Sequence, residues 1–594
     1  MIRVRNLRVW YPLRKGLFRE ILGRRRQWAK AVDGISFDIR KGEVLCLVGE
    51  SGCGKTSTGR AILKLTEATG GDVFLEIPGE QFNRFQEASS RPDRPESAKI
   101  ADEIRRKYSI TWRASIPWTG RDLLTLGGLL IAAVVAGFLL PSAAVGFLSD
   151  PFTNSWVTTG FGAALGALLG AVAGLPPGRP WRRLPLLVAL LSLALVVVGG
   201  IPTFFFAQAA GLAFSDPTVS LPWERDLFGM LMATALAPIC AAGTCAFLVD
   251  LRARTSDIGG IRMKGLRRRL QLIFQDPYES LNPKQSVYEI LAEPLQVNHV
   301  TRRPEETTSL VMDALRDAGL RPPEEFMFRF PHELSGGQRQ RVSIAAALVL
   351  QPDFIVADEP VSMLDVSIRT GILQLMMDLR ESRGLTYLFI THDLGLAWII
   401  ADRIAVMYLG KIVEIGTAEQ VIRGPRHPYT QALISVVPSP DPRKKVERVI
   451  VRGERPDAVN IPAGCRFHPR CPFAFERCGW TPQEVADQLR SLDPRGTVFK
   501  ESGLEIPDAR TLRIAPGLEG PEALARDLRG IIAGQRETSL ALKGIVEVRA
   551  SAHSVDVILH ESEEPELLEI GPGNSVACHL VTERRAESVT AGAD

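Results

Sequence analysis

A glycine-rich loop with one lysine and one threonine is the strongest chemical signal in the first part of the chain. The run GESGCGKT, Gly49–Thr56, directly follows an apolar run, Glu43–Val48, that has the composition of a buried strand. Glycines let backbone N–H groups turn inward around phosphate oxygens, the Lys55 ammonium can reach the β- and γ-phosphates, and the Thr56 hydroxyl can bind Mg²⁺. The helix expected over Ser57–Leu65 adds an N-terminus that favours anions. The loop therefore predicts an ATP phosphate site formed by Gly49, Glu50, Ser51, Gly52, Cys53, Gly54, Lys55, Thr56 and Ser57.

Two adjacent carboxylates end a second apolar run. In FIVADEP, Phe354–Pro360, hydrophobic residues lead directly into Asp358 and Glu359. Asp358 can hold Mg²⁺ directly or through water, and Glu359 can polarise the water that attacks the phosphate. Adjacent acidic residues on a solvated turn are the plain alternative, but the apolar run before them argues against it. A third run, TYLFIT (Thr386–Thr391), ends just before His392. The pattern predicts a site for nucleotide hydrolysis.

Short apolar runs must position these residues. EVLCLV, DFIVAD and TYLFIT have the continuous apolar character of parallel strands buried on both faces, so an α/β fold is expected. At 594 residues, 45% hydrophobic and 23% charged, the chain has room for several folded domains. The net charge of +4 does not indicate nucleic acid, and no nucleic-acid partner is expected. The first residues are basic and contain no long apolar run, unlike a signal peptide, so the motifs are expected in the cytoplasm.

Four uncharged apolar runs separate the phosphate loop from the carboxylates. Each is long enough to cross a hydrocarbon layer of ~30 Å as a helix. The runs are Leu123–Leu140, Val157–Leu175, Leu184–Phe206 and Leu227–Val249. Basic residues precede the first run and follow the second and fourth, which places both ends of the insert on the cytoplasmic face. A buried core helix is the alternative for any single run, but four in succession argue against it. We therefore predict a four-helix transmembrane insertion over 123–250.

A further motif carries the resemblance to a known family. LSGGQRQR, Leu334–Arg341, resembles the signature of ABC-type ATPases, a loop that opens a helix and contacts the ATP bound by the opposite subunit of a dimer. The matching residues are Leu334, Ser335, Gly336, Gly337 and Gln338. SMLD, which ends in Asp365, resembles the D-loop that lines the dimer interface. LIFQDPYESLNP resembles the Q-loop region, in which Gln275 would sense Mg²⁺ and the attacking water.

The same resemblance assigns two further roles. His392 resembles the switch histidine that contacts the γ-phosphate. Either Trp10 or Tyr11 stands where the family stacks an aromatic ring on adenine, and the sequence leaves that choice open. Taken together, the resemblance implies catalytic roles for Glu359, His392 and Gln275, and Mg²⁺ contacts for Thr56, Gln275 and Asp358.

Longer runs of the sequence resemble one group within this family. AVDGISFDIRKGE, FQDPYESLNP, FPHELSGGQRQRV and RHPYTQALISVVPSPDP look like the ATP-binding subunits of oligopeptide and dipeptide importers. The FQDPY form and the basic GLFRE stretch look more like the second of the two paired ATPases. Two departures are Ala346, where arginine is usual, and GKTS for the usual GKST, in which Thr56 still provides a hydroxyl. The implied partners are a second ABC ATPase subunit or a second copy of the chain, two permease subunits, an extracytoplasmic peptide-binding protein and the cell membrane, with the ATPase on its cytoplasmic face.

Four cysteines in the last part of the sequence form a separate pattern. They are Cys465, Cys471, Cys478 and Cys578. Four thiolates in a reducing compartment suit an iron–sulfur cluster or structural zinc, and spacing alone does not separate the two. The pattern resembles the four-cysteine site of peptide-importer ATPases, which implies a 4Fe-4S cluster. The family's gap before the last cysteine is shorter, so residues 485–570 look like a second insertion, and its alternating VEVRASAHSVDVILH indicates small α/β structure.

These inferences combine into one expected architecture. It is an α/β, ABC-type P-loop NTPase with a RecA-like core and a helical subdomain, interrupted by the transmembrane insertion. The expected parts are a first ATPase part at 1–80, a polar linker at 81–122, the insertion at 123–250, a second ATPase part at 251–442 and a peptide-importer-type region at 443–594. The expected function is ATP hydrolysis that drives import of oligopeptides or dipeptides. The alternatives are a self-contained half-transporter that uses its own spans and a membrane-anchored regulatory ATPase.

Overall fold

The computed structural model describes nine stretches of the chain. They are residues 1–13, 27–91, 94–111, 263–437, 448–451, 453–492, 503–516, 520–536 and 538–581. The four predicted spans lie between 112 and 262, outside the described residues, so the transmembrane insertion stays a prediction. Among the helices of the described stretches, none is both long and apolar enough to cross a membrane.

The largest sheet of the described stretches, called the central sheet below, has eight strands in the order β14-β15-β9-β8-β3-β7-β6-β5. Its strands are β3 (Val44–Val48), β5 (Leu270–Ile273), β6 (Phe354–Asp358), β7 (Thr386–Thr391), β8 (Arg403–Tyr408), β9 (Lys411–Thr417), β14 (Leu568–Gly571) and β15 (Asn574–Val576). From β5 to β8 neighbouring strands run parallel. Every residue of β3, β6 and β7 is buried, which explains why these strands are continuously apolar in sequence. The three strands predicted from the sequence are confirmed.

A smaller antiparallel sheet, ordered β2-β1-β4, comes from the first part of the chain, with β3 of the central sheet between β2 and β4 in sequence. Its strands are β1 (Ile2–Pro12), β2 (Trp28–Ile39) and β4 (Gly70–Leu75). The alternating burial of β1 from Ile2 to Val9 shows that one face of this sheet contributes to a core. The end of β1 carries both candidate adenine-stacking residues, Trp10 and Tyr11.

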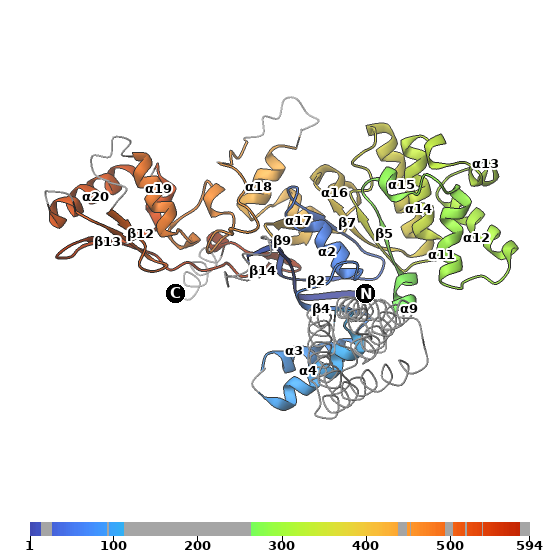
Figure 1. Ribbon diagram of the computed structural model, residues 1–594, viewed down its shortest axis with the longest axis horizontal. Coiled ribbons are helices and arrows are strands. Elements are labelled where there is room, and N and C mark those ends of the chain that lie inside the picture. Colours follow the sequence, from blue (N-terminus) through green and yellow to red (C-terminus); the bar gives the residue numbers. More distant parts are fainter. Residues whose placement is uncertain are drawn as a thin grey trace, which may run out of the picture. The chain divides into compact units, whose positions relative to one another are not determined.

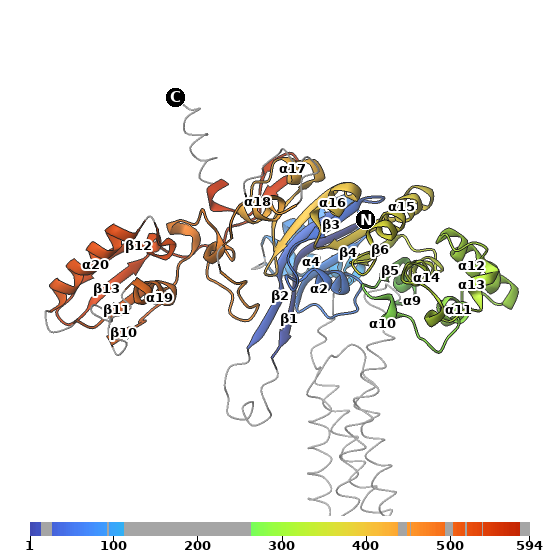
Figure 2. The ribbon, with the colours of Figure 1, turned by 90° about the horizontal axis from the view of Figure 1, so that it is seen from above.

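The helices pack in two hydrophobic cores, one against the central sheet and one within a group of helices. The helices that follow or flank its strands are α2 (Lys55–Ile62), α9 (Met263–Arg269), α15 (Val366–Arg383), α16 (Leu394–Ile400), α17 (Ala418–Arg423) and α18 (Pro428–Ser435). A second group, visible beside β5 in Figures 1 and 2, contains α10 (Pro277–Ser280), α11 (Val287–Val297), α12 (Pro304–Asp317), α13 (Pro323–Met327) and α14 (Gly336–Leu348). Helix α14 joins the two cores, because Val342 and Ala345 pack in the helical one while Ile344 and Leu348 pack against the sheet. The helical subdomain is therefore attached to the sheet through the helix that carries the signature.

Residues predicted to begin a polar linker at 81 instead form helices. These are α3 (Gly79–Ser89) and α4 (Pro95–Tyr108). Phe82 and Phe85 of α3 pack against Phe74 of β4, with ring centroids 6.0 and 4.7 Å apart. The guanidinium of Arg3 lies 4.2 Å from the Phe82 ring centroid. Two aromatic residues at i and i+3 thus give the charged segment one apolar face, which stabilises a helix despite its polar composition.

The C-terminal region contains a further sheet and then returns to the central one. After α19 (Pro482–Leu492), strands β10 (Leu504–Glu505), β11 (Thr511–Ile514), β13 (Val555–Leu559) and β12 (Ile545–Ala550) form an antiparallel sheet in that order, with α20 (Pro521–Gln535) packed on β12. The chain then adds β14 and β15 to the central sheet, where Ser575 and Val576 pair with Ile415 and Glu414 of β9. No sequence pattern predicted this return, because strands of three or four residues have no periodic signature.

Candidate active site

The phosphate loop is shaped by glycines that no larger residue can replace. A Cβ on Gly49 would lie 2.2 Å from the Met407 carbonyl oxygen, and one on Gly54 would lie 2.1 Å from the Ala31 carbonyl oxygen. Gly54 also has a φ of +108°, a conformation that favours glycine. The buried Lys55 ammonium donates hydrogen bonds to the carbonyl oxygens of Gly49, at 2.7 Å, and Glu50, at 3.1 Å. The loop therefore wraps around the ammonium that is expected to face the phosphates.

A hydroxyl and a carboxylate meet at the carboxyl edge of the central sheet. The Thr56 hydroxyl, at the start of α2, donates to Asp358 Oδ1 over 3.0 Å although the two residues are 302 positions apart. Burial raises the pKa of Asp358, and the hydrogen bond from Thr56 opposes that rise. Hydroxyl and carboxylate oxygens are the ligands that Mg²⁺ prefers, so this pair fits a magnesium site.

Three polar side chains from three loops converge beside this pair. Gln275 Nε2 donates to Glu359 Oε2 over 3.2 Å, and His392 Nδ1 lies 3.2 Å from the same oxygen. Glu359 directly follows β6 and has a left-handed φ of +47°, a strained conformation for a residue with a side chain. Its backbone N–H donates to the Ile390 carbonyl oxygen of β7, which holds it in that conformation. The structure thus brings together all three residues that the sequence analysis named as catalytic.

The signature residues form a rigid helix start in the helical subdomain. Ser335 and Gln338 cap α14 reciprocally: the Gln338 N–H donates to the Ser335 hydroxyl, and the Ser335 N–H donates to the Gln338 side chain. A Cβ on Gly337 would lie 2.8 Å from Ile368 Cγ2, so α15 packs closely against this point. Leu334 is buried in the helical core. Within the described stretches, no hydrogen bond or ion pair joins Leu334–Gln338 to Gly49–Ser57.

The segment predicted as the D-loop follows Glu359 and leads into α15, with Asp365 as its N-terminal cap residue. The Ser362 hydroxyl donates to the Glu359 carbonyl oxygen at 3.0 Å. Arg369 donates to the Leu364 carbonyl oxygen at 2.6 Å, a contact that the sequence analysis missed. Met363 of this segment is 62% exposed.

The two aromatic candidates for adenine have different surroundings. Tyr11 is 41% exposed, and its hydroxyl lies 3.3 Å from the hydroxyl of Ser57 at the start of α2. The Trp10 indole N–H instead donates to Asp33 at 3.0 Å, and the Lys30 ammonium lies 5.1 Å from its ring centroid. Tyr11 thus reaches the phosphate-loop helix through its hydroxyl, whereas the Trp10 indole N–H is bonded to Asp33.

An ion pair that the sequence analysis also missed joins the phosphate loop to the C-terminal region. The Arg470 guanidinium contacts both carboxylate oxygens of Glu50 at 3.0 and 3.3 Å. A second arginine, Arg466, pairs with Asp33 at 2.6 Å. No local sequence pattern predicts either pair, because their members are more than 400 residues apart.

The four cysteines predicted to bind a metal occupy one neighbourhood. Burial raises the pKa of Cys465 well above its usual range, and the nearby Cys478, Cys578 and Cys471 thiols add to the rise. Burial likewise raises the pKa of Cys471 to about 12. Across the described part of the chain, no three His, Cys, Asp or Glu side chains are placed so that they can hold a metal ion. The iron–sulfur or zinc centre predicted from the four cysteines therefore stays a prediction, and no catalytic step depends on it.

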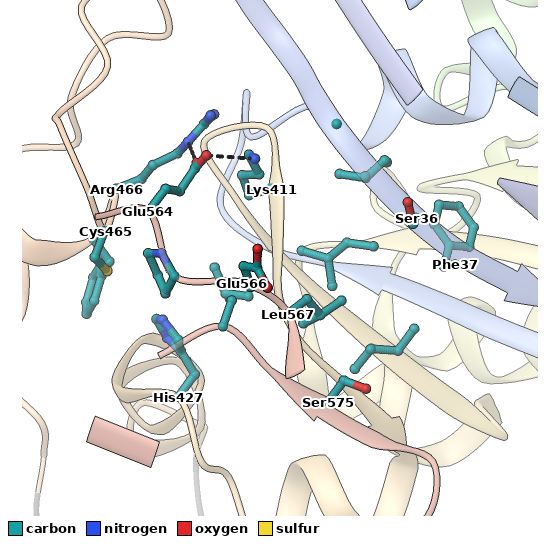
Figure 3. Close-up of a pocket in the computed structure, with 18 of the residues that line it drawn as sticks. Ser36, Phe37, Lys411, His427, Cys465, Arg466, Glu564, Glu566, Leu567 and Ser575 are labelled. Carbon is teal, nitrogen blue, oxygen red and sulfur yellow. Dashed lines mark hydrogen bonds and ion pairs between the residues drawn. The ribbon is translucent and has the colours of Figure 1, made fainter. Parts of the chain in front are cut away.

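A cavity of about 800 Å³ lies beside β9, under the chain that leads to β14. Figure 3 shows Glu564 at its wall, contacted by both Lys411 and Arg466 at 3.0 Å. Arg5 and Arg403, which also line it, pair with Asp38 and Glu43. Since the cations that line the cavity pair with carboxylates, the cavity marks the place where the C-terminal region returns to the central sheet.

Known families match both ATPase parts and the cysteine region. A family model described as "ABC transporter" matches residues 32–111 and 242–362, and one described as "Oligopeptide/dipeptide transporter, C-terminal region" matches 413–478. A putative oligopeptide transport ATP-binding protein, YkfD of Bacillus subtilis, is 48% identical over 38% of this chain and 68% of its own length. A putative peptide import ATP-binding protein of Brucella ovis is 46% identical over 41% of this chain and 74% of its own length. The dipeptide transport ATP-binding protein DppF of Haemophilus influenzae is 50% identical over 36% of this chain and 65% of its own length.

Proposed function

The chain belongs to the family of ABC-transporter ATP-binding proteins for oligopeptides and dipeptides, and from this premise we propose that it hydrolyses ATP to drive a peptide importer. The observation that carries the proposal is the convergence of Gln275 and His392 on Glu359, next to the Thr56–Asp358 pair. Phosphate release from Mg-ATP by the purified chain, alone and assembled with permease subunits, tests it. Absence of release in both preparations would refute the proposal.

The geometry supports a division of labour among the chain's own residues. The phosphate-loop N–H groups and Lys55 bind and orient the triphosphate. Thr56 and Asp358 would hold Mg²⁺, which neutralises charge on the phosphate oxygens. Glu359 accepts a hydrogen bond from the attacking water, with Gln275 and His392 fixing the carboxylate's orientation. Most of the rate enhancement comes from these preorganised charges rather than from covalent chemistry.

The signature supports a head-to-tail dimer as the working form. Its capped helix start presents backbone N–H groups that suit an anion, yet within the described stretches it makes no bond to the chain's own phosphate loop. A second ATPase subunit or a second copy of this chain would supply the missing half of each site.

We assign adenine stacking to Tyr11 because its hydroxyl reaches Ser57 of the phosphate-loop helix. Tyr11→Ala is expected to raise the KM for ATP about tenfold with little change in kcat, since aromatic stacking on a base contributes about 1–3 kcal/mol. Trp10→Ala is the matched change on the neighbouring residue and should leave the KM within about threefold of wild type. A larger effect of Trp10→Ala than of Tyr11→Ala in steady-state kinetics would reverse the assignment.

The transport setting follows from the family and from the predicted spans. Two permease subunits and an extracytoplasmic binding protein would complete the importer, with the ATPase at the cytoplasmic face of the cell membrane. The predicted insertion at 123–250 would anchor the ATPase there, and the identity of the chain as the second of two paired ATPases remains a sequence prediction. Labelled-peptide uptake by liposomes that contain this chain alone would favour the half-transporter alternative, and uptake only with permeases present would exclude it.

For the cysteine region we propose binding of an iron–sulfur cluster, with zinc as the alternative. The shared neighbourhood of the four thiols supports it, since Cys478, Cys578 and Cys471 all lie near enough to Cys465 to raise its pKa. Anaerobically purified protein is expected to contain about four irons and four sulfides per chain, and Cys471→Ser should lower both. One zinc per chain would select the alternative, and protein free of both metals would end the proposal. Cys46→Ser, a buried cysteine in β3, is the control.

A further inference from the structure

The ion pair between Arg470 and Glu50 links the cysteine region directly to the phosphate loop. Arg470 immediately precedes Cys471, and its two terminal nitrogens contact the Glu50 carboxylate at 3.0 and 3.3 Å. The same guanidinium donates to the Tyr408 hydroxyl at 3.3 Å. Only 13% of the Arg470 side chain and 32% of the Glu50 side chain are exposed. A two-pronged pair this well shielded from water is stronger and more directional than a surface ion pair.

Glu50 needs such a partner because of where it lies. It is the second residue of a loop whose neighbouring N–H groups are expected to bind a triphosphate, so an unpaired carboxylate there would repel the ligand. The Glu50 backbone N–H also donates to the Tyr429 hydroxyl at 3.0 Å. The backbone and the side chain of this residue are therefore both held, by groups that come from outside the loop.

The fold of the cysteine segment, residues 465–478, determines where Arg470 points. The Arg470 N–H donates to the Phe467 carbonyl oxygen at 3.0 Å, in the short 3₁₀ turn His468–Arg470. The Phe467 ring is buried between Tyr408 and Tyr429, with centroids 5.2 and 5.3 Å away. Since the turn is anchored by a buried aromatic cluster, the guanidinium is presented to the loop in one orientation.

We propose that Arg470 is a positioning residue of the nucleotide site, through which the cysteine segment sets the affinity of the phosphate loop for ATP. Arg470 cancels the charge of Glu50 and keeps the loop in its phosphate-binding shape. This inference rests on the proposed ATPase function. It predicts an effect on binding rather than on the chemical step, because Arg470 contacts Glu50 and Tyr408 rather than the hydrolytic carboxylate Glu359.

Steady-state hydrolysis by the full chain, assembled with its partner subunits, tests the proposal. Arg470→Gln is expected to raise the KM for ATP about tenfold, with kcat within about twofold of wild type. Adding Glu50→Gln should bring the KM back to within about threefold, because the unpaired carboxylate is then gone. Arg470→Lys keeps the charge but loses the two-pronged geometry, so its KM should fall between those of the wild type and Arg470→Gln.

A matched control breaks another ion pair of the same segment. Arg477 pairs with Glu563 at 3.1 Å, so Arg477→Gln disturbs the segment while leaving the Arg470–Glu50 pair in place, and its KM should match wild type. An unchanged KM in Arg470→Gln, or a raised KM that Glu50→Gln does not restore, would overturn the proposal. If Arg470→Gln does not fold, the KM of Arg470→Lys decides in the same way. Inactive wild-type protein would instead count against the ATPase function itself.

Discussion

Glu359→Gln is expected to lower phosphate release at least about 100-fold while ATP still binds. Removing a general base typically costs two to four orders of magnitude in rate. The amide keeps the size and one acceptor oxygen of the carboxylate, so Gln275 and His392 can still pack around it. The loss therefore concerns the charge that polarises water rather than the shape of the site. Phosphate release and binding of a fluorescent ATP analogue, measured on the same preparation, separate the two effects.

The control for this variant is a glutamate outside the site. Glu381 is exposed near the end of α15, and Glu381→Gln should retain wild-type turnover. Undiminished phosphate release by Glu359→Gln would refute the assignment of Glu359 as the catalytic carboxylate. Loss of ATP binding together with turnover would instead show that its charge is needed to form the site.

Lys55→Met is expected to raise the Kd for ATP about 100-fold, so that binding rather than hydrolysis is lost. A hydrogen bond to a charged group contributes about 1.5–3 kcal/mol, and at the upper end that corresponds to this change in Kd. Two losses act together, because the ammonium binds phosphate and also bridges the Gly49 and Glu50 carbonyl oxygens. Methionine keeps the apolar stem of the side chain, so the buried position is still filled. Equilibrium binding of an ATP analogue measures the effect without requiring turnover.

Lys41→Met is the matched change, since Lys41 is an exposed lysine just before β3. Its ATP affinity should equal that of the wild type. If Lys55→Met binds ATP as tightly as Lys41→Met, the Gly49–Thr56 loop is not the phosphate site. Lys55→Met and Glu359→Gln, measured together, distinguish a defect in ATP binding from a defect in hydrolysis.

The residues that can do chemistry were predictable from short stretches of sequence. The Gly49–Thr56 loop, the run into Asp358 and Glu359, and the signature at Leu334–Gln338 are contiguous, and each has a local shape that follows from its own residues. Buried parallel strands were equally readable, because burial on both faces leaves a continuous apolar run. Composition misled at α3, where a charged segment folds as a helix because Phe82 and Phe85 share one face.

Which of these residues come together depends on the packing of distant elements. Thr56 reaches Asp358 across 302 residues, and Gln275 and His392 reach one oxygen of Glu359, because the parallel strands β3, β5, β6 and β7 end at the same edge of the sheet. The contact of Arg470 with Glu50 spans 420 residues and depends on how a buried aromatic cluster orients one turn. Local patterns specify helices, strands and loops, whereas contacts between distant residues arise from the packing of those elements on one another, which no short stretch of sequence encodes.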